Sequence, residues 1–133
     1  MSGLVWVLDS GALVAFARGV ETVGQLLVDV ADTEGTVAIP LICLIEAYSQ
    51  LHRDEHTLLK MLRRNPVVRT IVPETDLDQL DDCPFIGTFA AQTGRLGAAH
   101  AAYVALVNVA GVVTTRPDQV RAALGDKWEI IDV

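Results

Sequence analysis

Long apolar segments are missing from this chain, although its composition is hydrophobic. Its 133 residues are 51% hydrophobic with a mean hydropathy of +0.38, yet no uninterrupted apolar run approaches the ~18 residues that a membrane span needs. The apolar stretch at the N-terminus has no basic segment before it and is interrupted by Asp9, which argues against a signal peptide. We therefore expect one domain over residues 1–133, with no membrane partner and a cytoplasmic location.

Cysteine and positive charge are also scarce. The two cysteines, Cys43 and Cys83, provide no disulfide framework and are expected to fill space as thiols in a reducing compartment. The chain has ten Lys and Arg residues and 17 Asp and Glu residues, which gives a net charge of −7. Such a balance argues against a protein that coats nucleic acid nonspecifically, but it does not exclude a nuclease.

The few basic residues are concentrated between positions 52 and 69. Five of the ten lie there, namely Arg53, Lys60, Arg63, Arg64 and Arg69. This stretch predicts one positive face on an acidic protein, with Arg63 and Arg64 as candidate RNA-binding residues. An ordinary solvated helix face is the alternative interpretation.

Five short apolar runs alternate with helical patterns. The runs cover 4–9, 36–39, 67–72, 111–115 and 128–133. The helical patterns cover 10–18, with Ser10 as a candidate N-cap, then 21–32, 41–51, 54–64, 76–82, 84–94, 96–110 and 117–124. Continuous apolar strands separated by helices predict an α/β protein with three α/β/α layers and a central, mainly parallel sheet of about five strands.

Asp9 follows the first predicted strand, at the edge where open α/β sheets bind ligands. The later strands do not end in the second acidic residue that a receiver domain uses. Asp9-Ser10-Gly11 is not the Asp-x-Asp of haloacid-dehalogenase-like phosphatases, and the chain has no glycine-rich phosphate loop. These three site types are therefore disfavoured.

Three segments, in this order, resemble the PIN-domain family of Mg²⁺- or Mn²⁺-dependent ribonucleases, which includes toxins of toxin–antitoxin pairs. The segments are "VLDSGALVAF", "IPLICLIEAYSQL" and "VVTTRPDQV". The resemblance implies a PIN-like fold and a phosphodiester-cleaving site in which Asp9 and Glu46 bind the metal and Ser10 lies beside them. Oxygen ligands suit Mg²⁺, which would activate a water for attack on RNA.

The second half of that site departs from the family pattern. No Asp or Glu occurs between Asp82 and Asp118, so the acid expected at the start of the helix near 97–100 is absent. The acid expected after the fourth strand is replaced by Arg116, with Asp118 two residues further on. We therefore expect a depleted acidic site with weak or lost ribonuclease activity, or else an inactive PIN-like module that binds RNA or protein.

Each candidate also has a plain structural interpretation. Asp9 could cap a helix, Glu46 could be the polar edge of its helix, and Asp118 has capping-box spacing from Thr115. His100 is either a substitute ligand, better suited to Mn²⁺ than to Mg²⁺, or a packed core histidine. If Arg116 lies near Asp9, its guanidinium would take the place of the cation.

The resemblance also implies partners. It suggests a homodimer and an antitoxin segment that lies over the site, with Mg²⁺ or Mn²⁺ as the cofactor if the protein is active and none if it is not. Apolar surface on the helices near 21–30 or 57–62 would favour a groove for such a partner.

Overall fold

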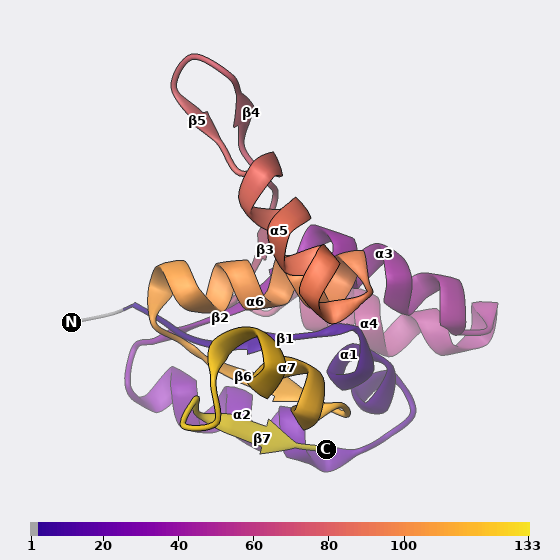
Figure 1. Cartoon of the computed structure of the whole chain (residues 1–133). Helices are drawn as coiled ribbons and strands as arrows, with labels where there is room; N and C mark the ends of the chain where they lie inside the picture. The colour runs from indigo at the N-terminus through magenta and orange to yellow at the C-terminus, as the bar shows by residue number, and fades with distance from the viewer. Residues whose placement is uncertain (1–2) are drawn as a thin grey trace.

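A central five-stranded sheet lies between layers of helices in the computed structural model, which describes residues 3–133 (Figure 1). The strands are β1 (Leu4–Leu8), β2 (Thr36–Pro40), β3 (Val68–Ile71), β6 (Gly111–Thr114) and β7 (Ile130–Asp132). Their order is β3-β2-β1-β6-β7, and every neighbouring pair is parallel. The predicted α/β class and five-stranded parallel sheet are confirmed.

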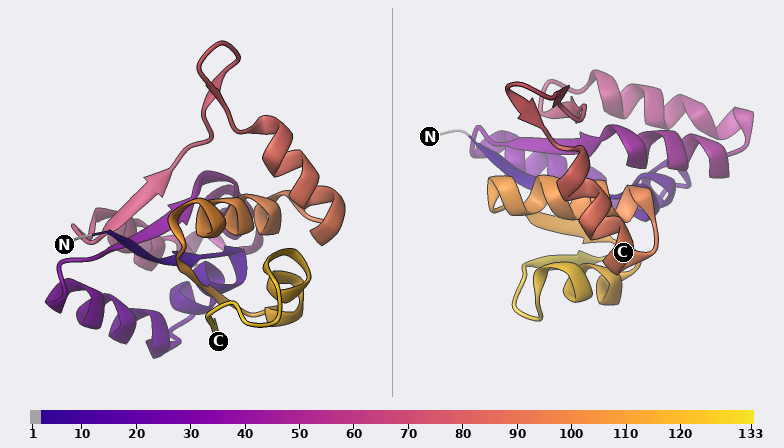
Figure 2. Two further views of the ribbon diagram at one scale, coloured as in Figure 1. Left: turned by 60° about the vertical axis from the view of Figure 1, so that its left-hand side comes forward. Right: turned by 45° about the horizontal axis from the view of Figure 1, so that its top comes forward.

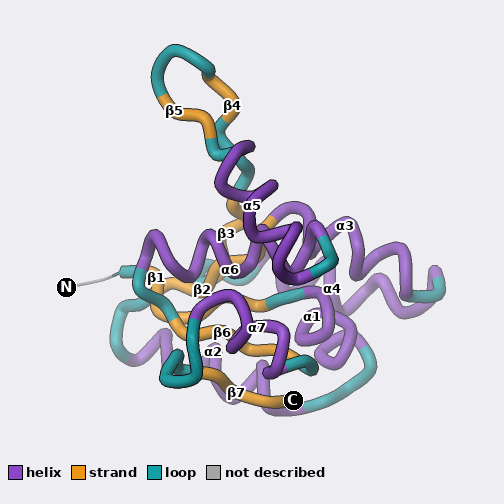
Figure 3. Tube along the Cα trace, in the orientation of Figure 1, coloured by secondary structure: helices purple, strands orange, loops and turns teal. Residues whose placement is uncertain are grey.

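Helices follow the strands and cover the sheet on both faces. They are α1 (Ser10–Ala17), α2 (Glu21–Asp32), α3 (Leu41–Gln50), α4 (His56–Arg64), α5 (Cys83–Thr93), α6 (Leu96–Asn108) and α7 (Pro117–Leu124), with a 3-10 turn, η1 (Arg53–Glu55), before α4. Figure 1 shows α6 along one face of the sheet and α2 along the other, and Figure 3 shows how short the connections are. The predicted three-layer α/β/α architecture is confirmed.

The alanine-rich helix α6 packs closely on the sheet. Its buried side chains are small, and they include Ala99, Ala101, Ala102 and Ala105. Small side chains let a helix backbone approach a sheet closely, so this face needs no large apolar residue. Leu96 and Val107 are 60% and 61% exposed, so only one face of α6 is covered, although its sequence is apolar nearly all round.

The segment 76–82 is a β-hairpin, and the prediction of helical turns there is wrong. Strands β4 (Thr75–Asp76) and β5 (Leu80–Asp81) pair antiparallel and project away from the sheet (Figure 2). The Asp76 carboxylate accepts a hydrogen bond from the Asp78 N–H at 3.0 Å, which closes a turn. Aspartate favours such local bonds over a helix interior, and four aspartates between 76 and 82 would also repel one another in a helix.

Among residues 3–133, no single helix is long and apolar enough to cross a membrane. Only α1 and α2 taken together reach the required length and composition, and they are bent by 105° relative to each other.

Candidate functional site

Asp9 lies at the carboxyl end of the central strand β1. Its carboxylate accepts a hydrogen bond from the Ala12 N–H at 3.0 Å, so Asp9 is the N-cap of α1 and the prediction of Ser10 in this role is wrong. Its own N–H donates to the Val113 carbonyl at 3.2 Å, which fixes it against β6. Only 7% of Asp9 is exposed.

Burial raises the pKa of the Asp9 carboxyl above its usual value. The Thr114 hydroxyl, the Ala12 N–H and the charge of Arg95 oppose this rise. Thr114 is the last residue of β6, the neighbour of β1, so the strand order itself brings the hydroxyl to the acid. Asp9 is thus a buried carboxylate whose nearby positive charge comes from Arg95.

Helix α3 brings Glu46 to Ser10, the residue that follows Asp9, and we call Asp9 and Glu46 the acid pair. The Ser10 hydroxyl donates a hydrogen bond to Glu46 Oε1, which joins the start of α1 to α3. The Gly97 N–H donates to Glu46 Oε2 at 3.3 Å. The structure therefore brings together Asp9, Ser10 and Glu46, the three residues that the resemblance assigned to the first half of the site.

Arg95 forms an ion pair with this cluster. Its guanidinium Nη2 lies 3.5 Å from Glu46 Oε1, and both side chains are about one-third exposed at 30% and 29%. Sequence reasoning missed this residue and named Arg116 as the competing cation. Arg95 immediately precedes α6, the helix at whose start the resemblance predicted an acid. This position was the only indication in the sequence that Arg95 could lie near the site.

Gly97 occupies the part of α6 that faces Glu46. A Cβ atom at position 97 would overlap the Glu46 carboxylate and lie 2.9 Å from Ser10 Oγ. Any side chain here would therefore collide with Glu46 and Ser10. The Glu46 carboxylate fills the space that a side chain at position 97 would need.

Cys43 lies under this cluster. Its thiol donates to the Gly97 carbonyl at 3.0 Å, and burial raises its pKa, so it remains protonated. Cys43 is fully buried, so the prediction that it fills space in the core is confirmed. Cys83 is exposed, so the same prediction is wrong for Cys83.

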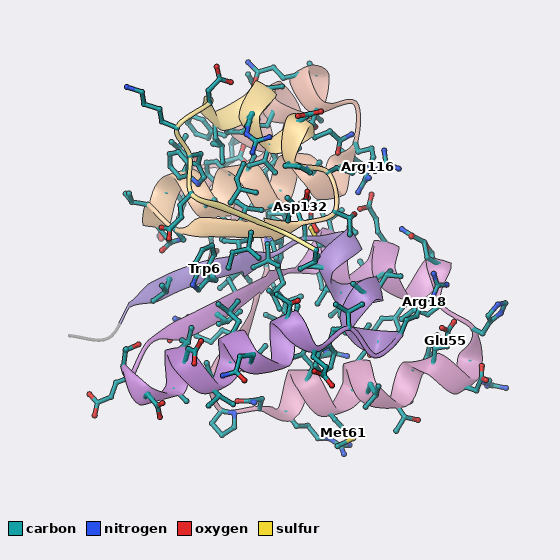
Figure 4. The ribbon with its side chains drawn as sticks, turned by 90° about the horizontal axis from the view of Figure 1, so that it is seen from below. Trp6, Arg18, Glu55, Met61, Arg116 and Asp132 are labelled. Atoms are coloured by element: carbon teal, nitrogen blue, oxygen red, sulfur yellow. The ribbon has the colours of Figure 1, made fainter. Side chains whose placement is uncertain are left out.

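Among residues 3–133, neither Arg116 nor Asp118 forms an ion pair or a side-chain hydrogen bond with the acid pair, although the Arg116 N–H donates to the Thr114 hydroxyl at 2.9 Å. Arg116 is exposed, begins α7 and is drawn at the periphery of Figure 4; within residues 3–133 it forms no ion pair. The Asp118 side chain is fully exposed and pairs with Arg121 at 3.4 Å along the same helix. No side chain caps α7, so the capping box suggested for Asp118 is not formed.

His100 lies one turn after Gly97 on α6 and faces α3 beside Ile42, where it belongs to a second polar cluster. Its Nδ1 accepts the Ile42 N–H at 3.4 Å, and it lines a small cavity with Asp82 and Tyr103. Burial lowers the pKa of His100 to about 4, although the Asp82 charge opposes this shift. His100 is a neutral, packed histidine in the structure and does not join Asp9 and Glu46.

The donor set does not suit a divalent cation. Within the described part of the chain, no three His, Cys, Asp or Glu side chains are grouped as metal ligands. Glu46 is already bound by Ser10, Arg95 and the Gly97 N–H, and Mg²⁺ sites in proteins rely on free carboxylate oxygens. We therefore derive no chemical step through a metal from this arrangement.

Two further surface features lie outside the acid pair. An apolar groove of about 640 Å³ is bordered by α1, α2 and α4, with Phe16, Val20, Val28 and Leu58 among its lining residues. It lies where the sequence favoured a partner groove. A separate hollow is lined by Lys60, Arg63, Arg64 and Thr70, and it contains both candidate RNA-binding residues.

Comparison with known proteins identifies the fold. No protein-family model and no curated protein sequence matches the chain. The structure is similar to the crystal structure of PAE2754 from Pyrobaculum aerophilum, with a TM-score of 0.64 and 20% identity over 100% of this chain and 92% of that one. It is also similar to VapBC2 from Rickettsia felis bound to a DNA fragment from their promoter, with a TM-score of 0.60 and 18% identity over 97% of this chain and 98% of that one.

The chain is an α/β/α protein whose acid pair lies at the carboxyl edge of its sheet. It has the PIN-like fold, and the predicted resemblance is confirmed at the level of the fold.

Proposed function

We propose that this chain is a PIN-like protein of the toxin–antitoxin type that acts by binding and in which metal-dependent RNA cleavage is weak or lost. The observation that carries the proposal is the ion pair between Arg95 and Glu46, beside buried Asp9. A guanidinium here supplies the positive charge that a metal ion would supply in an active site of this type. The resemblance to the VapBC2 complex supports the toxin–antitoxin assignment.

The depleted ligand set supports the loss of hydrolysis. Gly97 brings no carboxylate to the pair, Arg116 is exposed, and Asp118 is paired with Arg121. Mg²⁺ affinity falls as anionic ligands are lost, so two carboxylates, one of them already paired, would hold the ion weakly.

The apolar groove is the proposed docking surface for a partner protein. Val28 and Leu58 are 56% and 41% exposed there. Because both line the same concave surface, they form a continuous apolar patch, and such patches mark interaction sites more often than scattered apolar residues do. An amphipathic helix of an antitoxin-like partner would bury these residues, as helices do in other apolar grooves. A homodimer is part of the same proposal and rests on the resemblance alone.

A ribonuclease assay tests the loss of hydrolysis. The purified protein is incubated with RNA and either Mg²⁺ or Mn²⁺, and Asp9→Asn is assayed in parallel from the same preparation scheme. We expect equal background cleavage from both proteins. Metal-dependent cleavage that disappears in Asp9→Asn would show an active nuclease and reject the proposal.

Coexpression tests the partner groove. If a small reading frame adjacent to this gene encodes a DNA-binding protein, its product should copurify with the chain, and Val28→Glu should release it. Ile45→Glu is the control, because Ile45 is equally exposed at 59% but does not line the groove. Equal release by both variants would remove the groove from the interaction.

A further inference from the structure

A hollow beside the edge strand β3 is lined by basic residues that the proposed function does not use. Lys60, Arg63 and Arg64 of α4 line it together with Thr70 of β3, and its volume is about 460 Å³. We call it the basic hollow. The three cationic residues are exposed, whereas Thr70 is half-buried.

The amphipathic pattern of α4 directs these charges to one side. Leu59 and Leu62 are 0% and 2% exposed and anchor the helix, so Lys60 and the adjacent arginines remain toward solvent. Arg63 and Arg64 occupy the last turn, where the helix dipole favours positive charge. The exposed Met61 lies on the outer surface of the same helix in Figure 4.

None of the three cations is neutralised within residues 3–133. The ion pairs of this part of the chain use Arg18, Arg95 and Arg121. With 17 acidic residues in the sequence, carboxylates are plentiful, yet none lies within ion-pair distance of the basic hollow. Positions 60, 63 and 64 are neighbours on one helix, so their like charges repel unless an anion joins them.

We propose that the basic hollow binds phosphate groups, with the backbone of single-stranded RNA as the ligand. Arginine forks match the geometry of phosphate oxygens, and the Thr70 hydroxyl supplies a further donor. No aromatic side chain lines the hollow, so bases have nothing to stack on and binding is independent of sequence.

The basic hollow is separate from the acid pair. It lies against the edge strand β3, and β2 lies between β3 and the strand β1 that leads to Asp9. The inference goes beyond the proposed function, since phosphate binding here holds whether or not the acid pair cleaves RNA. A failure of one is therefore distinguishable from a failure of the other.

The remaining charge of the protein sets the expected strength of binding. A net charge of −7 repels RNA from most of the surface, so binding is weak and confined to low salt. Three phosphate contacts on a single strand predict a slope of about −2 for log K against log salt.

Fluorescence anisotropy with a labelled oligouridylate tests the proposal. Arg63→Gln with Arg64→Gln removes two charges from the hollow, and Arg53→Gln with Arg69→Gln removes two charges outside it. Arg69 is the more closely matched residue of this control. It is next to Thr70 on β3, but because successive strand residues point to opposite faces, its side chain lies outside the hollow. Thermal melting checks that each variant is folded.

We expect the hollow variant to lose about tenfold in affinity and to flatten the salt slope to about −0.7, while the control stays within twofold of the unaltered protein. Equal binding of oligoadenylate and oligocytidylate supports backbone recognition. Inorganic phosphate that competes as well as RNA, at equal phosphate concentration, supports the site but assigns it to free phosphate. Absent binding, or equal losses in both double variants, overturns the proposal.

A protein ligand is the remaining outcome. The projecting β4–β5 hairpin carries Asp76, Asp78 and Asp81, and a second copy could place these acids in the hollow. If the hollow variant dissociates an oligomer in sedimentation and leaves oligouridylate binding unchanged, the hollow is a contact between copies and the RNA proposal is rejected.

Discussion

Two buried carboxylates, Asp9 and Asp82, lie in polar clusters of different kinds. Asp9 is 7% exposed and has Glu46 and the guanidinium of Arg95 beside it. Asp82 is 9% exposed and is held only by neutral donors, the Glu74 N–H at 2.8 Å and the Tyr103 hydroxyl at 2.7 Å.

The two clusters differ in charge, because one joins carboxylates to a guanidinium and the other binds a single carboxylate with neutral donors. A structural carboxylate needs donors, and Asp82 has one for each oxygen, joining the base of the hairpin to α6. The Asp9 cluster gathers two acids at a sheet edge and then adds a cation to offset them, which costs desolvation that an apolar core would avoid.

The largest expected effect concerns His100 in the Asp82 cluster. Burial lowers its pKa in the folded protein from the usual 6.5 to about 4, so the folded state favours the neutral ring. Below pH 6.5 the unfolded chain binds a proton at this histidine and the folded protein does not. The free energy of unfolding is therefore highest above pH 6.5 and falls as the pH is lowered toward 4. By linkage the loss amounts to about 3 kcal/mol, measurable by urea unfolding at a series of pH values.

His100→Asn is the control for this titration. Asparagine can keep an acceptor for the Ile42 N–H but cannot bind a proton, so its stability should change less between pH 6.5 and 4. Asp9 has the opposite effect on the pH dependence of stability. Because its pKa is raised in the folded protein, protonation at low pH removes the cost of burying its charge. An identical pH profile for the variant and the unaltered protein would show that another group titrates.

Gly97→Ala should disturb the Asp9 cluster. The added Cβ overlaps the Glu46 carboxylate, so Glu46 must move away from Ser10 and the Gly97 N–H. Because Glu46 is flexible and partly exposed, it can swing away, and the lost hydrogen bonds should cost about 1 kcal/mol in denaturant unfolding. Gly87→Ala is the matched control, because Gly87 is also helical but has open space around its Cβ position, and alanine should leave stability equal or improved there. Equal effects at both positions would refute the tight contact.

Tyr103→Phe should loosen the hairpin joint. The change removes the hydroxyl that donates to Asp82 and keeps the ring stacked on Phe85. We expect a loss of about 1 kcal/mol and faster amide hydrogen exchange in residues 74–82, with no change near Asp9. Unaltered exchange in the hairpin would show that the Glu74 bond alone holds it.

Asp9→Asn should produce the smallest change and the opposite sign. The amide removes a buried charge whose pKa is raised and still accepts the Ala12 N–H as an N-cap. The melting temperature at neutral pH should rise slightly. A fall would mean that the attraction between Asp9 and Arg95 outweighs the burial of the charge.

Predictability from the sequence differed between the two clusters. Asp9 could be placed at the sheet edge because it follows the strand β1 of a parallel sheet, whereas Ser10 and Glu46 were assigned to the site from the family resemblance. The Asp82 cluster was missed because local acid spacing in 76–82 suggested helical turns, whereas side-chain bonds to the backbone close a hairpin.

The cation could not be assigned from the sequence either. Arg95 and Arg116 both flank predicted helix starts near the site, and only the packing of α6 against α3 decides between them. The same packing fixes Gly97, and not a neighbour, against Glu46. Such contacts depend on helix rotation and loop length, which short motifs do not specify.

Calorimetric titration with Mn²⁺ tests the central claim, that Arg95 and Gly97 leave the acid pair without a competent metal site. The unaltered protein should show weak or undetectable binding, and Arg95→Gln should bind measurably more tightly, because it loses the cation that pairs with Glu46. Tight, one-to-one binding by the unaltered protein that Asp9→Asn abolishes would contradict the account.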